Sequence, residues 1–363
     1  MKIFHIIAGL PQAAGTSVFV GEITNVLAKG GHDVTVAVVV GNPNVPGRYP
    51  LNKNVKLISI ADLGYEKELP AIAHIHGCWD YPLHHACRWA NQNHVPIVWS
   101  PHGALSPWAM RHKRWKKIIP WYLYQRHDLA SAQVLHATTE LEIGWNQWFG
   151  FAGKPVLVPL GVHLPQKFNK RVRMVNEPLR VLFVGRVYPV KGLLNVVRAA
   201  AKLKDVSIRF RIVGPDQAGH QSELIAEADR LGVSSMFEWP GPKFGEELSD
   251  EYEACDILIL PSFTENFGAT VAEALAHGRP ALASRFTPWR ILDERKCGWW
   301  VDNEPSTLAE TLRAVALLDA ETLTTMGMKG RKLVAEQYSW QAVGSQLESV
   351  YGGLLEHSTS GVC

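Results

Sequence analysis

Cysteine is scarce in this sequence and shows no paired spacing. The five cysteines are Cys78, Cys87, Cys255, Cys297 and Cys363. Without CxxC pairs they indicate neither a disulfide framework nor a zinc site, so a reducing cytoplasm is the expected environment. Long apolar runs are also missing, because no stretch approaches the roughly 18 residues that span a bilayer. Any membrane contact is therefore expected to be peripheral.

A strong excess of one charge is absent as well. The 363 residues carry a formal net charge of only +3. Nucleic-acid-binding domains are usually strongly basic, so nucleic acid is not an expected partner. The mostly apolar run at residues 3–8 meets Gly9 at once and is too short for the core of a signal peptide.

Two nucleotide-binding fingerprints are missing. No G-x-G-x-x-G follows the first expected strand, and no G-x-x-x-x-G-K-[ST] occurs in the chain. These absences argue against a dinucleotide dehydrogenase and against a P-loop ATPase.

Apolar strand-like runs alternate with helical patterns in both halves, which predicts an α/β fold with parallel sheets. The first half has expected strands at 3–8, 34–40, 74–76, 97–100, 134–138 and 156–159, with a helix across 18–29. The second half has expected strands at 180–184, 207–213, 236–239, 257–261, 280–283 and 298–301. We therefore predict two Rossmann-like, doubly wound domains that face each other across a cleft.

The expected domain boundaries follow from the same pattern. An N-terminal domain at 1–165 is followed by a basic linker at 166–178 and a C-terminal domain at 179–338. A last helix at 339–356 is expected to pack back on the N-terminal domain. The polar residues 357–363 are expected to be frayed.

Charged side chains follow two expected strands of the second half, where ligands of open α/β sheets bind. After strand 180–184, Gly185 permits a close backbone approach, and Arg186 and Lys191 supply cations suited to a diphosphate. The alternative is a solvated loop with incidental charges.

The second loop follows strand 257–261 and leads into a helix whose open N-terminus can face an anion. Two carboxylates, Glu265 in the loop and Glu273 on the helix, can accept hydrogen bonds from sugar hydroxyls. Between these carboxylates lie four residues that could also contact the ligand: Asn266, Phe267, Gly268 and Thr270. For Glu273 the alternative is an ordinary surface or helix-dipole glutamate.

These motifs resemble the retaining glycosyltransferases of family 4, which have the GT-B fold. Residues 183–186 with Lys191, and 261–262 leading to Glu265 and then to Glu273, carry the resemblance. Further similar stretches are 30–34, 159–162, 278–280 and 338–340, so the resemblance covers nearly the whole chain.

The resemblance implies a nucleotide-diphosphate sugar as donor. Arg186 and Lys191 would bind its diphosphate, Glu265 its sugar and Glu273 its ribose. The backbone of residues 266–268 would approach sugar and phosphate, and residues 241–248 would border the base. Neither the sugar, the base nor the acceptor can be named from these residues.

The N-terminal half matches the family less closely. Family members often show a Gly-Gly pair followed by Glu after the first strand, whereas this chain has Gly15 and Thr16, which could still cap a phosphate. Ser17 as a plain helix cap is the alternative. His102 resembles the family's active-site histidine and could hydrogen-bond a sugar hydroxyl or take part in proton chemistry near neutral pH. A buried structural histidine is the alternative.

Two features of the first half remain open to several interpretations. His74 and His76 share a strand but lack acidic or cysteine partners at metal-ligand spacing, so we expect no metal there. A basic and aromatic segment at 111–122 fits contact with an anionic membrane and a lipid-linked or other glycan acceptor. It carries Arg111, Lys113, Arg114, Trp115, Lys116 and Lys117. The alternative is a solvated helix that packs its aromatic residues inward.

No Asp-x-Asp occurs in the chain, so a metal-bridged diphosphate is not expected, and neither is another cofactor. The cations and a helix N-terminus would stabilise the leaving diphosphate instead. The resemblance implies retention of anomeric configuration. A sugar-nucleotide epimerase of the same fold and a nonenzymatic nucleotide- or carbohydrate-binding protein are the alternatives.

Overall fold

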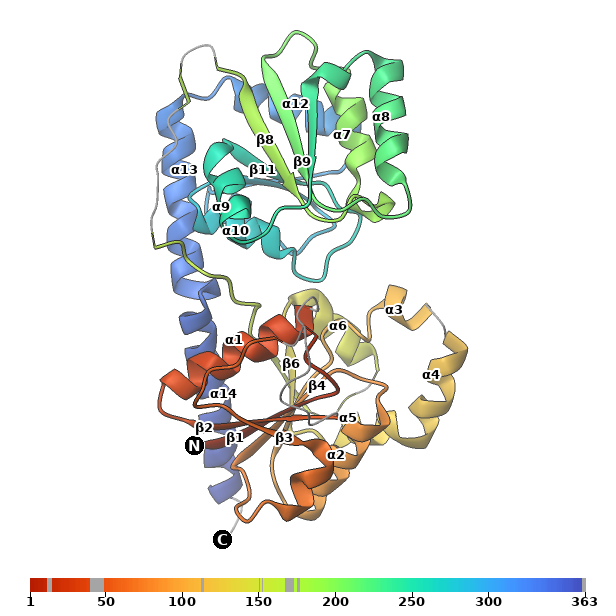
Figure 1. The fold of residues 1–363 in the computed structure, drawn as a ribbon, viewed down its shortest axis with the longest axis vertical. Coiled ribbons are helices and arrows are strands. Elements are labelled where there is room, and N and C mark those ends of the chain that lie inside the picture. Colours follow the sequence, from red (N-terminus) through yellow and green to blue (C-terminus); the bar gives the residue numbers. More distant parts are fainter. Residues whose placement is uncertain are drawn as a thin grey trace. The chain divides into compact units, whose positions relative to one another are not determined.

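The computed structural model describes residues 1–11, 15–39, 49–111, 114–149, 151, 153–166, 173–174 and 177–360. The chain divides into two compact units, each built on a parallel sheet (Figure 1). Unit 1 comprises Met1–Gly161 and Trp340–Cys363, and unit 2 comprises Val162–Ser339. Within the described residues no helix is long and apolar enough to cross a bilayer.

The sheet of unit 1 has seven parallel strands in the order β3-β2-β1-β4-β5-β6-β7. They are β1 Lys2–Ile7, β2 Asp33–Val38, β3 Lys56–Ser59, β4 Ile72–His76, β5 Ile97–Ser100, β6 Val134–Ala137 and β7 Lys154–Leu157. All but β3 lie within two residues of an expected strand. The sequence pattern missed β3 because it is short, begins with an exposed lysine and is only partly buried.

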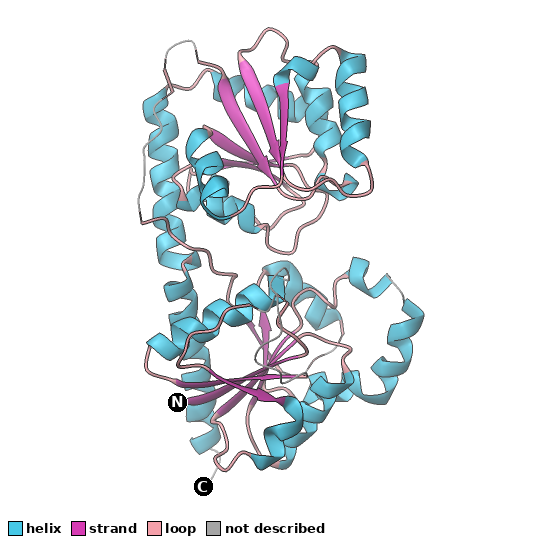
Figure 2. Ribbon diagram, in the orientation of Figure 1, coloured by secondary structure: helices cyan, strands magenta, loops and turns pink. Residues whose placement is uncertain are grey.

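Helices cover both faces of this sheet (Figure 2). They are α1 Gly15–Lys29, α2 Tyr81–Gln92, α3 Pro107–Arg111, α4 Arg114–Pro120, α5 Arg126–Ser131, α6 Glu140–Trp148 and α14 Trp340–Ser360, with a 3-10 helix η1 Ile60–Tyr65 and a π-helix η2 Trp121–Gln125. Successive strand side chains alternate between faces. Accordingly Ile3 packs in the core with α1 and α14, whereas Phe4 packs in a second core with α2.

The sheet of unit 2 has six parallel strands in the order β10-β9-β8-β11-β12-β13. They are β8 Leu179–Val184, β9 Ile208–Val213, β10 Phe237–Gly241, β11 Ile257–Leu260, β12 Ala281–Ser284 and β13 Gly298–Val301. The helices are η3 Pro189–Lys191, α7 Leu193–Ala200, α8 His220–Leu231, η4 Ser234–Met236, α9 Gly245–Ala254, α10 Ala269–Ala276, α11 Ile291–Glu294, α12 Pro305–Ala316, α13 Ala320–Leu333 and η5 Val334–Tyr338. Strands β8 and β11 are hydrogen-bonded neighbours, which brings the loops after them together.

The ends of unit 2 differ from the expected boundaries. Val162 forms a parallel bridge with Ser339, and its N–H donates to the Tyr338 carbonyl at 2.7 Å. The guanidinium of Arg173 donates to two carbonyls at the end of α12, so this part of the expected linker is fastened to unit 2. Of the linker, residues 167–172 and 175–176 lie outside the described residues.

The last helix, α14, belongs to unit 1 and is longer than expected. Its residues Val343, Leu347 and Tyr351 are buried in the core that α1 also lines. The helix includes residues 357–360, which were expected to be frayed, and 361–363 lie outside the described residues.

Two glycines of α14 offer a matched test of this packing. A methyl group at Gly344 would press on Val26 of α1, at 2.6 Å from its Cγ1, whereas Gly352 has no atom within 4 Å of the same position. We expect Gly344→Ala to lower the free energy of unfolding by about 1–3 kcal/mol through overpacking. Gly352→Ala should be neutral or stabilise by up to about 1 kcal/mol, because alanine favours the helix.

Urea unfolding of the full chain, followed by near-UV circular dichroism, measures both variants. Equal effects of the two substitutions would show that α14 does not pack on α1 as described.

Candidate functional site

The loop after β8 lies close to the loop after β9. Gly214, with φ of +150°, lies so near Gly185 that a side chain on Gly214 would overlap the Gly185 carbonyl. Arg186 is exposed, and its Nη1 donates to Oε1 of Gln217 at 2.9 Å. The guanidinium therefore lies toward the loop after β9, beside the end of β8.

Lys191 ends the short helix η3, and the loop then turns through Gly192 in the left-handed region, at φ of +71°. A side chain at Gly192 would overlap the carbonyl of Pro261, which follows β11. The N–H of Phe263 also donates to the Val190 carbonyl at 2.8 Å. These backbone contacts lock the loops after β8 and β11 together.

The contact between these two loops brings together Lys191 and Glu265, which were expected to bind different parts of a donor. Lys191 Nζ lies 2.5 Å from Glu265 Oε1, and the Ser262 hydroxyl donates to the same oxygen at 2.7 Å. The side chains of Lys191 and Glu265 are only 16% and 13% exposed. Each charge is therefore neutralised by the other, yet both remain reachable.

The loop 266–268 is held in place by contacts with Trp289 and Tyr338. The indole N–H of Trp289 donates to the Phe267 carbonyl at 2.6 Å, and the Phe267 ring packs against Trp289 and Tyr338. Gly268, directly before α10, has φ of +76°, and a Cβ there would come within 2.9 Å of Leu260.

Polar groups in the first turn of α10 are available to bind a ligand. Gly268, the residue before the helix, supplies no side-chain cap, so the first amides of α10 lack that partner. The Thr270 hydroxyl is buried and has no hydrogen-bond partner among the described residues. An anion at this end of the helix would satisfy these groups.

Glu273 lies one turn further along α10. The Tyr252 hydroxyl, on α9, donates to its Oε2 at 2.6 Å. Burial raises the pKa of Glu273, while the hydrogen bond from Tyr252 lowers it. Burial and the nearby Glu273 charge raise the pKa of Tyr252 well above its ordinary value, so it remains a donor. Sequence reasoning gave Tyr252 no role, and its being the one aromatic residue of α9 is the only available signal.

In unit 1, His102 sits in a tight turn after β5. Its φ is +52°, that of Gly103 is +75°, and the Gly103 N–H donates to Glu142 at 2.6 Å. The buried Glu142 also accepts from the N–H and hydroxyl of Thr138. Sequence reasoning missed Glu142, which fixes the backbone beside His102.

The His102 ring faces His76, with 3.0 Å between His102 Nε2 and His76 Nδ1. Burial lowers the pKa of His102 to about 3. The imidazole is therefore neutral at pH 7 in this environment, which differs from the expected titration near neutral pH. A neutral ring can still donate or accept one hydrogen bond at its remaining nitrogen.

The start of α1 lies close to this turn, since the Phe19 ring is 5.2 Å from the His102 ring. Gly15 and Thr16 form the first turn of α1, which begins three residues before the expected start. Ser17 lies inside the helix, buried and with no partner among the described residues for its hydroxyl, so the plain-cap alternative is wrong. Residues 12–14 lie outside the described residues.

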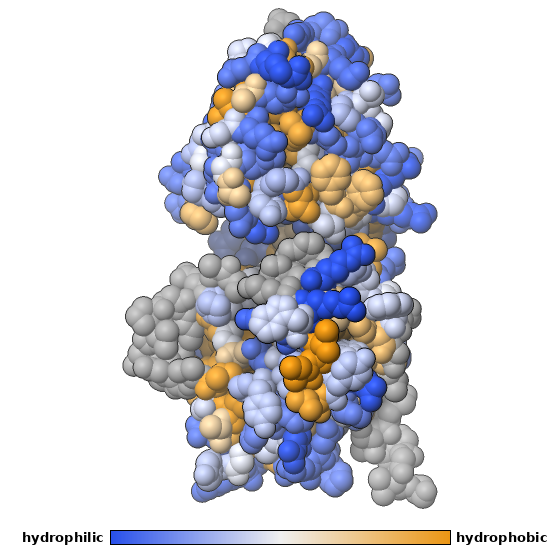
Figure 3. Space-filling model, turned by 90° about the vertical axis from the view of Figure 1, so that its right-hand side faces the viewer, coloured by the Kyte–Doolittle hydropathy of each residue, from blue (hydrophilic) through white to orange (hydrophobic). Residues whose placement is uncertain are grey.

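The basic and aromatic segment is exposed on unit 1, as α3, α4 and η2. No residue of α4 is buried, and the alternative of aromatics packed inward fails for Trp115, which is 70% exposed. Exposed apolar neighbours are Ile118, Ile119, Tyr122 and Leu123. Figure 3 shows apolar surface beside strongly hydrophilic surface on this side of unit 1.

The cations of this segment differ from one another. Arg111, Arg114 and Lys116 are exposed, and Lys116 Nζ lies 5.1 Å from the Trp115 ring centre. Lys117 instead turns inward, where it donates to the Ala109 carbonyl and lies over the Trp79 ring at 5.6 Å. Its expected outward role is therefore wrong. Lys113 lies outside the described residues.

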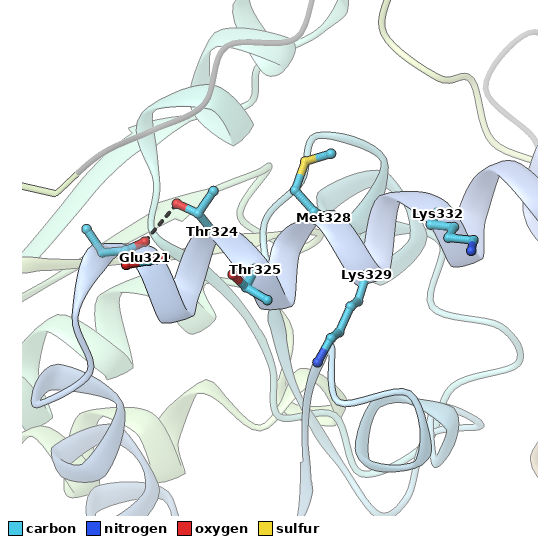
Figure 4. A pocket seen from close by; sticks show the side chains of 7 residues that line it. Glu321, Thr324, Thr325, Met328, Lys329 and Lys332 are labelled. Atoms are coloured by element: carbon cyan, nitrogen blue, oxygen red, sulfur yellow. Dashed lines mark hydrogen bonds between the residues drawn. The ribbon is translucent and has the colours of Figure 1, made fainter.

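A hollow of about 820 Å³ runs along α13 in unit 2 (Figure 4). All of its lining residues come from this one helix, and Thr324 already donates to the Ala320 carbonyl. Polar groups from several elements do not converge here, in contrast to the loops after β8 and β11.

Comparison with known proteins relates the second half of the chain to glycosyltransferases. Residues 166–333 match the family model described as "Glycosyl transferases group 1". D-inositol 3-phosphate glycosyltransferase of Corynebacterium efficiens is 35% identical over 47% of this chain and 42% of that protein. The protein of the same name from Corynebacterium urealyticum is 25% identical over 96% of this chain and 92% of its own. The chain thus spans about two fifths of the length of the first of these relatives.

Solved structures resemble the whole chain. Sucrose-phosphate synthase from Thermosynechococcus elongatus has a TM-score of 0.74 at 19% identity, with 98% of this chain and 100% of that chain covered. Anabaena HepE in complex with UDP has a TM-score of 0.74 at 14% identity, with 97% and 100% covered. At these identities the likeness concerns the fold. The segment 166–333, which makes up most of unit 2, is therefore similar to the group 1 glycosyltransferases, and the chain as a whole has the GT-B fold.

Proposed function

We propose that this chain transfers a hexose-type sugar from a nucleotide-diphosphate sugar to an acceptor hydroxyl. The observation that carries the proposal is the Lys191, Glu265 and Ser262 cluster beside the open first turn of α10. At one edge of the sheet, it combines a cation that can bind phosphate, a carboxylate that can accept hydrogen bonds from sugar hydroxyls, and the free amides of a helix N-terminus. Relatives and structural neighbours bear the names of glycosyltransferases, and one neighbour was solved with UDP-glucose.

On donor binding, Lys191 and Glu265 would exchange their contact with each other for contacts with the donor. Lys191 and Arg186 bind the diphosphate together with the α10 amides, and Glu265 then accepts hydrogen bonds from the sugar. Glu273 accepts from the ribose hydroxyls, with the 266–268 backbone against sugar and phosphate. Because Lys191 and Glu265 already neutralise each other, neither isolated charge has to be stabilised before the donor arrives.

The transfer itself would retain the anomeric configuration and need no metal. The bond between the anomeric carbon and the diphosphate oxygen breaks, and the charge that develops on that oxygen is met by Arg186, Lys191 and the α10 N-terminus. The acceptor hydroxyl attacks from the face that the phosphate leaves and gives its proton to the departing phosphate. Glu265 is not required as a nucleophile in this scheme, and neutral His102 hydrogen-bonds a substrate oxygen.

We expect Lys191→Ala and Glu265→Ala each to lower sugar transfer about 100-fold, because each removes a group directed at the reacting donor. Lys204→Ala is the matched control, since Lys204 is exposed and precedes β9, at the opposite edge of the sheet. A screen of nucleotide sugars for slow hydrolysis and for thermal protection identifies the donor to use.

The products separate the proposal from its alternatives. Full transfer in both variants, or no nucleotide sugar bound at all, would contradict it. Release of an epimerised nucleotide sugar would instead identify an epimerase, and binding without any turnover a nonenzymatic binding protein.

Donor binding should depend on the ionisation of Glu273. A protonated Glu273 accepts fewer hydroxyls, so affinity should fall as pH falls through the raised pKa of this carboxyl. Tyr252→Phe removes the hydrogen bond that lowers this pKa, so the loss of affinity should move to higher pH. At neutral pH the affinity should drop up to about tenfold.

Titration calorimetry with the donor across pH measures this shift. Ser249→Ala removes a hydroxyl from the same helix without touching Glu273 and should leave the profile unchanged. An unshifted pH profile in Tyr252→Phe would show that donor affinity does not depend on the ionisation of Glu273.

We also propose that the acceptor is a lipid-linked or polysaccharide-precursor glycan, reached from the inner face of the cytoplasmic membrane. Exposed cations of α4 lie next to exposed Trp115, Ile119 and Leu123, which is the composition of an interfacial helix. Cations contribute about 1 kcal/mol each near an anionic surface.

Replacing Arg111, Arg114 and Lys116 by Gln should reduce co-sedimentation with anionic liposomes about tenfold or more. Lys29, Lys53 and Lys67, exposed elsewhere on unit 1, provide a charge-matched control whose replacement by Gln should leave binding unchanged. Absence of binding by the unaltered chain, or equal losses in both sets, would remove the proposal.

A further inference from the structure

Five histidines form one group in unit 1, in which four rings are buried and that of His102 is partly exposed. They are His5 on β1, His74 and His76 on β4, His102 after β5 and His136 on β6. Burial lowers the pKa of every one of them, to about 3 for His5 and about 4 for His136. All five rings are therefore neutral at pH 7, and each has one N–H donor and one lone-pair acceptor.

The protons of two rings are fixed by a backbone carbonyl. His136 Nε2 lies 2.8 Å from the Val158 oxygen, which can only accept, so the proton of His136 is on Nε2. Its Nδ1 must then accept from the Ser100 hydroxyl at 2.5 Å. Ser100 has no second proton, so it accepts from His74 Nε2 at 2.6 Å. His74 Nδ1 accepts in turn from the Tyr351 hydroxyl at 2.6 Å.

A second chain of rings leads to His102. His5 Nδ1 lies 2.9 Å from His76 Nε2, and His76 Nδ1 lies 3.0 Å from His102 Nε2. Only two arrangements of protons satisfy both contacts. Either each ring donates toward His102, whose own proton is then on Nδ1, or each donates toward His5, and the His102 proton is on Nε2.

The far end of this chain distinguishes the two arrangements. His5 Nε2 is buried and has no hydrogen-bond partner among the described residues. Donation toward His5 would leave a buried N–H there without an acceptor, which is among the rarest defects in folded proteins. Donation toward His102 leaves only an unused lone pair.

The same contacts disfavour a metal ion. His5, His74 and His76 offer nitrogens within 4.8 Å of one another. The lone pair of His74 is taken by Tyr351, and that of His76 by the N–H of His5. Binding an ion would break hydrogen bonds on two of the three rings, so the cluster is better suited to orienting protons.

We propose that His5 and His76 are positioning residues that hold His102 in the tautomer with its proton on Nδ1. Nδ1 of His102 has no hydrogen-bond partner among the described residues, and it then presents a fixed donor to a substrate oxygen. The part of this inference that concerns substrate rests on the proposed glycosyl transfer. Glu142 holds the adjoining backbone, so both the ring and the turn of His102 are fixed.

Long-range ¹H–¹⁵N NMR of the histidine-labelled full chain at pH 7 reads the tautomer directly, with the His102 signals assigned by their loss in His102→Gln. We expect the proton of His102 on Nδ1. His76→Phe removes the donor to His102 Nε2 and should give a mixture of tautomers, with transfer lowered about three- to tenfold because only part of the population is competent.

His76→Asn is the conservative variant, because its amide can donate from the position of the imidazole Nδ1. It should restore both the Nδ1 tautomer and most of the transfer rate. His85→Asn, on the exposed side of α2, is the control and should change neither.

A His102 proton on Nε2 in the unaltered chain would overturn the proposal, as would a pure Nδ1 tautomer in His76→Phe. If His76→Phe does not fold, the unaltered chain and His76→Asn still decide the question. Failure of sugar transfer would leave the NMR result standing, so the two proposals fail separately.

Discussion

Burial of both faces of a parallel sheet is the constraint on which the rest of this structure depends. Strands such as β11 and β12 are buried throughout, so their interiors hold little that can react. Polar groups gather instead where the strands end, and neighbouring parallel strands end at the same edge. The Lys191, Glu265 and Ser262 cluster follows from β8 and β11 being adjacent, although 74 residues separate the lysine from the glutamate.

The loops of the proposed donor site are ordered by backbone contacts more than by their charged side chains. Gly192 and Gly214 permit approaches that any Cβ would block, and the Phe263 N–H fastens one loop to the other. This separation of roles leaves Lys191 and Glu265 able to exchange partners without loss of the loop conformation.

The sequence predicted the two α/β sheets and nearly every strand, because buried parallel strands are continuous apolar runs. It also singled out Lys191 and Glu265, which the structure brings together, because both lie in loops that follow strands. What it could not predict depends on non-local contacts. The bridge between Val162 and Ser339 moved the domain boundary, the inward turn of Lys117 depends on Trp79, and the partner of Glu273 comes from another helix.

The histidine group shows the same limit most clearly. His5 and His76 are 71 residues apart in sequence, and only the pairing of β1 with β4 brings their rings together. Two histidines on one strand invite a metal-site interpretation, whereas the three-dimensional contacts occupy their lone pairs with hydrogen bonds.

The five histidines of this group also make the stability of unit 1 depend on pH. Their folded-state pKa values lie below the ordinary value of 6.5, so the unfolded chain binds more protons between that value and about 3. Stability contributed by the neutral rings is therefore present above pH 6.5 and is lost as pH falls through this window. An apolar packing of similar volume would avoid that loss. The hydrogen-bonded rings instead give His102 a defined direction for its proton, which an apolar core cannot supply.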